Sequence, residues 1–206
     1  MEEPHRISAS RAPTVLAAAL LILAGCSHTL APSNVSAPAS GMTMASHGAP
    51  ARYFIDTVHV RKLEERRIGQ KNNAAGAFFA WVYTDADLST WAANEWKTYL
   101  NGRGQFVTST LRDADYYIQC DVHYLWVVKD FEWFEPDGFT GTARISATIY
   151  DRASKTPLFR RQANATYFVQ REGETEDGEM FNVVMSGAFR KALAKLGMPS
   201  LPAGKK

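Results

Sequence analysis

Residues 116–128, YYIQCDVHYLWVV, decide the fold, because apolar and polar side chains alternate along an extended run. A strand with this pattern belongs to a sheet that has one face on a core and a more polar face on the other side. We expect the core-facing set to be Tyr116, Ile118, Cys120, Val122, Tyr124, Trp126 and Val128, and the opposite set to be Tyr117, Gln119, Asp121 and His123.

Further strands are predicted on both sides of this one. A hairpin turn within residues 130–140 leads to a second alternating run at 143–149, and the turn DRASKT at 151–156 leads to a third at 159–169. Strands joined by short turns pair antiparallel. The β-rich residues 53–61 are predicted as the first strand of the domain. Residues 62–76 read as a loop, and residues 77–83, AFFAWVY, as a strand or a packed loop.

Two amphipathic helices complete the pattern. The first begins at the N-cap Asp87, has apolar residues at helical spacing up to Leu100, and stops at Asn101 and Gly102. The second has an apolar stripe from Phe181 to Leu196 and ends at Gly197 and Pro199. The element order β-α-β-β-β-α predicts an α+β fold: a two-layer sandwich of an antiparallel sheet with two helices on one face.

The start of the chain predicts export. Arg6 and Arg11 precede an apolar run at residues 15–23, the layout of a secretory signal peptide, which we assign to residues 1–25. The run is about half as long as a membrane-spanning helix. Residues 23–26, LAGC, resemble a bacterial lipobox, in which Cys26 is acylated and becomes the new N-terminus. The alternative is an ordinary signal peptide cut near Ala24 or Gly25, which leaves Cys26 as a plain thiol.

Three further segments follow the signal peptide. Residues 26–50 are rich in Ala, Ser, Pro and Gly and are predicted to be an acylated N-terminus and flexible tether. Residues 51–200 form the predicted domain and residues 201–206 a tail. Ser27 in place of aspartate favours delivery to the outer membrane, with the domain facing the periplasm. The net charge of +2 gives no reason to expect a nucleic acid partner.

The sequence predicts neither a metal site nor a cofactor nor catalysis. His59 and His123 lie on separate predicted strands, and no histidine pairs with another histidine or a cysteine at ligand spacing. Cys120 is expected to be a small buried hydrophobic residue. The acidic residues 172–179 are interpreted as a solvated connection whose last acids favour the helix that follows, with weak calcium binding as the alternative. An enzyme that uses Asp121 and His123 is a further alternative.

The hairpin at residues 130–139, DFEWFEPDGF, carries four aromatic side chains among acids. Exposed aromatic residues are typical of recognition sites. Two interpretations stay open: the rings fold back over the sheet edge or over residues 77–83, or they bind a partner. The predicted contact residues are Phe131, Trp133, Phe134 and Phe139.

The chain resembles a group of small bacterial envelope lipoproteins: the YajG-like proteins and the auxiliary (PqiC-like) lipoproteins of ABC-type transport systems. The resemblance rests on the lipobox, on GQFV at 104–107, ADY at 114–116 and YDR at 150–152, on ERRIG at 65–69, and on the closing helix. It covers the lipobox and residues 52–197. These families imply a non-enzymatic accessory protein and no catalytic residues.

From these observations we expect a non-enzymatic outer-membrane lipoprotein that binds an envelope protein or an apolar ligand in envelope assembly or transport. Its predicted contact surface is the polar sheet face of Tyr117, Gln119, Asp121 and His123 together with the aromatic hairpin. The alternative is a structural or stress-related lipoprotein that contacts peptidoglycan or another envelope protein.

Overall fold

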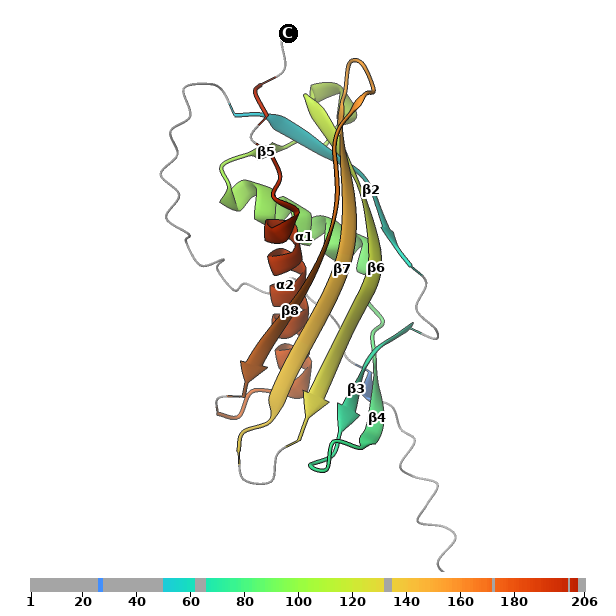
Figure 1. Ribbon diagram of the computed structural model, residues 1–206, viewed down its shortest axis with the longest axis vertical. Coiled ribbons are helices and arrows are strands. Elements are labelled where there is room, and N and C mark those ends of the chain that lie inside the picture. Colours follow the sequence, from blue (N-terminus) through green and yellow to red (C-terminus); the bar gives the residue numbers. More distant parts are fainter. Residues whose placement is uncertain are drawn as a thin grey trace, which may run out of the picture.

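The computed structural model describes residues 26–27, 50–61, 66–131, 135–171, 173–199 and 201–203 (Figure 1). The predicted signal peptide lies outside the described residues, as do residues 28–49 of the predicted tether. Of residues 26 and 27 only the backbone is described.

Three long antiparallel strands form one side of the sheet: β6 (Tyr116–Asp130), β7 (Gly138–Asp151) and, at the edge, β8 (Pro157–Gln170). They run along the length of the molecule in Figure 1. The predicted α+β class is confirmed, because two long helices accompany this sheet in the described part of the chain. The two predicted hairpins are also confirmed, since β6 pairs with β7 and β7 with β8.

The other edge of β6 is shared by two shorter strands that lie end to end. β2 (Arg52–Val60) pairs with residues 116–122, and β3 (Arg67–Asn72) pairs with residues 127–130. Both run parallel to β6, so the sheet is mixed rather than wholly antiparallel. The region predicted as a loop thus contains β3, and residues 77–83 contain the strand β4 (Phe78–Tyr83), antiparallel to β3.

Two very short strands extend the sheet. β5 (Phe106–Val107) pairs parallel with β2, and β1 (Cys26–Ser27) pairs parallel with β4. A single turn of 3-10 helix, η2 (Leu111–Asp113), precedes β6. Cys26 and Ser27, the first two residues of the predicted tether, therefore pair with β4 on the outer side of the β3–β4 hairpin.

Both helices cover the same face of the sheet. In α1 (Leu88–Gly102) the predicted N-cap is confirmed, because the Asp87 carboxylate accepts hydrogen bonds from the amides of Ser89 and Thr90. α2 (Asp177–Leu196) ends at Gly197, whose φ of 62° is left-handed. α2 lies very close to β7: a Cβ on Gly141 would lie 2.2 Å from the Val184 carbonyl oxygen. Among the described residues, no helix combines the length and apolar character that crossing a membrane requires.

The core fills the space between this face of the sheet and the two helices, where Trp91 of α1 meets Phe189 of α2 edge to face. A buried carboxylate also joins the helices: Glu95 accepts hydrogen bonds from Arg190 Nε at 2.5 Å and from Ser186 Oγ at 3.0 Å. Cys120 is buried, as predicted, and burial raises the pKa of its thiol to about 12. It is therefore a packing residue.

One strand departs from the predicted alternation. The pairing of β6 with β7 shifts between Val122 and Tyr124, which leaves His123 as the extra residue of a β-bulge. A one-residue shift moves every later side chain to the other face. Leu125 and Val127 are consequently buried, whereas Tyr124 is 41% exposed. The prediction that Tyr124, Trp126 and Val128 face the core is wrong for this reason.

Candidate functional site

The sheet face away from the helices is the candidate site, and we call it the outer face. It is built from cross-strand pairs of β6 and β7, whose side chains lie next to one another. Tyr117 stacks on Tyr150 with ring centroids 4.8 Å apart and an interplanar angle of 8°. The pairs along the two strands are Tyr117 with Tyr150, Gln119 with Thr148, Asp121 with Ser146, Tyr124 with Arg144, and Trp126 with Thr142.

Four aromatic side chains form a continuous line on the outer face, at the end of the sheet that contains β3 and β4. We call this line the aromatic strip. Phe78 and Trp81 come from β4, and Trp126 and Tyr124 from β6. The centroid distances are 4.3 Å from Phe78 to Trp81, 6.4 Å from Trp81 to Trp126, and 6.2 Å from Trp126 to Tyr124. Rings at these separations interact favourably. The strip thus connects β4 to β6, the two strands that flank β3.

Two arginines flank the aromatic strip. The Arg67 guanidinium lies 4.3 Å from the Trp81 ring centroid, within the range of a cation–π interaction. Arg144 is the cross-strand partner of Tyr124. Burial raises the pKa of Tyr124, and the positive charge of Arg144 opposes that shift. The strip therefore combines rings with a positive charge over Trp81 and another beside Tyr124, at its β6 end.

The predicted polar residues of β6 lie on the outer face, as expected. Gln119 donates to the Asp56 carboxylate at 3.0 Å, and His123 Nε2 lies 2.8 Å from Ser146 Oγ. These contacts hold the polar half of the face together. His123 is thus hydrogen-bonded to a serine of β7 rather than to Asp121, the partner that the enzyme alternative invoked.

The predicted aromatic hairpin separates into residues with different environments. Phe131 is 43% exposed, and Trp133 and Phe134 lie outside the described residues. Phe139 is fully buried, with its ring 5.4 Å from that of Phe181. The prediction that Phe139 contacts a partner is therefore wrong: it is the first large inward-facing residue of β7, and it belongs to the core.

A cluster of charges lies where α2 begins. The Asp177 carboxylate receives Lys71 Nζ at 2.9 Å and Lys129 Nζ at 3.0 Å, and it also contacts Arg171. Lys129 Nζ lies 2.9 Å from Asp137 as well. Burial alone would raise the pKa of Asp177, but the hydrogen bonds from the two lysines outweigh it and lower the pKa to about 2.

This charge cluster is internally paired. Asp177, from the acidic residues 172–179, begins the helix, which agrees with the interpretation that the last acids of that segment favour the helix N-terminus. Within the described ranges, no group of histidine, cysteine and acidic side chains is arranged to hold a metal ion. The cluster therefore binds the start of α2 to β3 and β6.

The residues of the aromatic strip that sequence reasoning missed are Tyr124, Trp126, Trp81 and Phe78. The first two were assigned to the wrong face because the bulge at His123 has no clear signature in an alternating sequence. The sequence shows an uncharged aromatic run at residues 77–83, but it does not show which strand lies beside that run. The contact of this run with β6 is therefore not predictable from the sequence alone.

Comparison with known proteins gives no match to any protein-family model and none to a curated protein. Among solved structures, the chain is similar to protein XCC0632 from Xanthomonas campestris, of family DUF330, with a TM-score of 0.45 and 13% identity over 84% of this chain and 90% of that one. It is also similar to a minor lipoprotein from Acinetobacter baumannii, with a TM-score of 0.36 and 11% identity over 77% and 99% of the two chains.

Lipoprotein GNA1162 from Neisseria meningitidis is a third similar structure, with a TM-score of 0.31 and 11% identity over 71% of this chain and 99% of that one. Bacterial lipoproteins are thus among the structures that this chain is similar to. At these identities and TM-scores the likeness carries no inference about activity, so the function is argued from the residues of this chain.

Proposed function

We propose that this chain is a lipid-anchored envelope protein that binds a protein partner through the aromatic strip and catalyses no reaction. Acylated Cys26 fastens it to the outer membrane, and the α+β domain faces the periplasm as an accessory component of envelope assembly or transport. The sequence LAGC at residues 23–26, directly after an apolar run, supports the anchor.

The single observation that carries the binding role is the aromatic strip on the sheet face that neither described helix covers. Tryptophan, tyrosine and arginine are the residue types that contribute most to protein–protein affinity. Here Trp81, Trp126 and Tyr124 lie in one line with Arg67 and Arg144 beside them. Rings in this position contribute little to the core, which lies on the other side of the sheet.

The chemistry of the strip also indicates what the partner presents. Flat aromatic faces bind apolar side chains, and guanidinium groups bind carboxylates in a forked geometry. We therefore expect a protein surface with apolar residues flanked by aspartate or glutamate. Because the strip lies across neighbouring strands, the partner covers a broad, shallow surface rather than filling a deep cavity.

Photo-crosslinking in whole cells tests this function. A photoreactive phenylalanine analogue is introduced at Thr142, the cross-strand partner of Trp126, in the full chain. The expected result is one discrete crosslinked protein, whose yield falls several-fold when Tyr124→Ser and Trp126→Ser are combined. The yield falls because the partner loses its main apolar contacts.

Two controls make the result specific. The same analogue at Ala153, in the turn between β7 and β8, should give no crosslink to that protein. Phe168→Ser changes another exposed aromatic residue, outside the strip, and should leave the yield unchanged. Equal crosslinking from Thr142 in the presence and absence of the two strip rings would refute a binding role for the strip.

A further inference from the structure

The turn that joins β3 to β4 is exposed and uncharged. Residues 73–79 read NAAGAFF, and residues 75–79 are all exposed to solvent. Phe78 is 50% exposed and Phe79 is 59% exposed. Turns at the ends of hairpins are ordinarily rich in polar and charged residues, so two exposed phenylalanines beside alanine and glycine need an apolar environment.

Most backbone amides of this turn donate to acceptors within the turn itself. The Asn73 side-chain oxygen accepts from the amides of Ala75 and Ala77 at 3.0 Å each. The Asn73 amide donates to the Ala77 carbonyl at 2.8 Å. A segment that enters the boundary of a lipid bilayer must pair its backbone polar groups internally, because unpaired groups are costly there. The amides of Asn73, Ala75, Gly76 and Ala77 have acceptors within the turn, which lowers the cost of placing it at that boundary.

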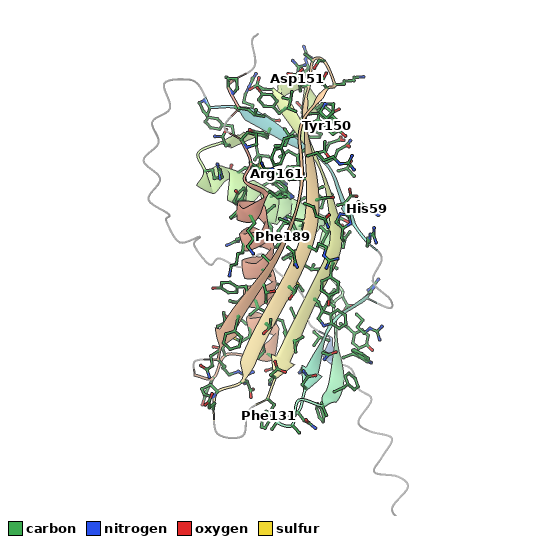
Figure 2. All side chains as sticks on the ribbon, viewed as in Figure 1. His59, Phe131, Tyr150, Asp151, Arg161 and Phe189 are labelled. Atoms are coloured by element: carbon green, nitrogen blue, oxygen red, sulfur yellow. The ribbon has the colours of Figure 1, made fainter. Side chains whose placement is uncertain are left out.

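A third exposed ring lies at the same end of the molecule. The Phe131 amide donates to the carbonyl of Asn72, the last residue of β3, at 3.3 Å. Figure 2 shows Phe131 at one end of the molecule and Asp151 at the other. We call Phe78, Phe79, Phe131 and the turn residues 75–77 the apolar tip.

The acylation site faces this tip. β1 runs parallel to β4, with Cys26 opposite Val82 and Ser27 opposite Tyr83. Because the two strands run in the same direction, the amino side of Cys26 points along β4 toward Phe78. Phe78 lies four residues before Val82, which is about 13 Å at the rise of a strand. The backbone at the acylated end of the mature chain is therefore directed toward the apolar tip.

We propose that the apolar tip inserts into the phospholipid headgroup boundary of the bilayer that holds the acyl chains, and that it thereby fixes the orientation of the domain. This inference rests on the lipid anchor of the proposed function and adds a second membrane contact to it. The tip has no charged residue between positions 73 and 79, so its insertion depends on buried apolar area rather than on attraction to anionic lipid. The aromatic strip then begins near the membrane at Phe78 and leads away from it.

Depth measurement with spin labels tests the proposal on the full acylated chain in vesicles of phosphatidylethanolamine and phosphatidylglycerol. Ala75→Cys places a label in the tip and keeps all three rings. Ala153→Cys places one in the β7–β8 turn at the opposite end. Cys120 is buried and does not compete for the label. The expected result is that the label at 75 is several-fold more accessible to oxygen, relative to an aqueous nickel chelate, than the label at 153.

A second variant addresses the rings themselves. Phe79→Ser in the Ala75→Cys protein should return the label at 75 toward the aqueous value, while 1 M salt should not. Equal aqueous exposure of both labels in protein that floats with the vesicles would overturn the insertion and leave the anchor intact. The anchor is tested separately by Cys26→Ser combined with Phe79→Ser, which removes an inserting ring as well and should release the protein from membranes. Retention of that variant would overturn the anchor, while the label depth still decides the tip.

Discussion

The two faces of the sheet are built by the same strands but carry different kinds of side chain. The inner face carries mostly small and aliphatic residues, with Phe139 among them, and lets α2 approach so closely that Gly141 has no room for a Cβ. The outer face carries stacked and tilted rings, arginines and hydrogen-bonded polar pairs. The inner face therefore fixes the fold, whereas neither of the two described helices covers the outer face.

The bulge at His123 exchanges the faces to which odd- and even-numbered residues of β6 point. Before it, even-numbered residues of β6 face the helices, and after it, odd-numbered residues do. Tyr124 and Trp126 consequently lie on the outer face beside the β4 rings. Without the extra residue, those two rings would point at α2, and Leu125 and Val127 would point outward.

Substitution at Leu125 gives the largest expected loss of stability. Leu125→Ala removes a fully packed inner-face side chain and leaves a cavity under the helices. Deletions of this kind lower the free energy of unfolding by about 2–5 kcal/mol. Urea unfolding followed by circular dichroism measures the change. A loss below about 1 kcal/mol would show that Leu125 does not face the core and that the bulge is not where the structure places it.

Protonation of Asp177, in the charge cluster at the start of α2, gives an intermediate loss of stability that depends on pH. The pKa of Asp177 is about 2 in the folded protein, below its ordinary value of 3.8. The carboxylate therefore stabilises the fold above about pH 4, and this contribution, about 2 kcal/mol, is lost as the pH falls toward 2. The measurement is the free energy of unfolding between pH 5 and pH 2.

Asp177→Asn supplies the control for that measurement. The variant should be less stable at neutral pH and should lack this part of the acid dependence, because it has no carboxylate to protonate at that position. An identical loss of stability with acid in both proteins would assign the effect to other carboxylates. It would show that the ion pairs of Asp177 contribute nothing to the free energy of unfolding.

Much of the fold was predictable from local patterns in the sequence. Alternation marked β7 and β8, helical spacing marked α1 and α2, and the single residues Asp87 and Gly197 marked where one helix starts and the other ends. These signals are local, because each depends on residues within one or two turns. The arrangement of the β2 and β3 strands along one edge of β6 depends on pairing between distant residues, which a single sequence does not display.

The candidate site was predicted only in part for the same reason. Tyr117 and Gln119 were placed on the correct face because strict alternation holds up to Val122. The strip was missed because its members come from two strands and because alternation fails at His123. Gly69 carried a usable signal: a Cβ there would lie 2.1 Å from the Val127 carbonyl oxygen, so a glycine inside a predicted loop marked a close approach to β6.

Substitution at Tyr124 gives the smallest expected effect on stability and the most direct comparison with Leu125. The two residues are neighbours on β6 but lie on opposite faces, and Tyr124→Ala removes a ring that is already 41% exposed. We expect the free energy of unfolding to fall by less than about 1 kcal/mol, because the ring loses one contact with Trp126 and leaves no buried cavity. The same urea titration measures both variants. A loss as large as that at Leu125 would mean that the outer rings are needed for folding, and their exposure would then no longer indicate a binding surface.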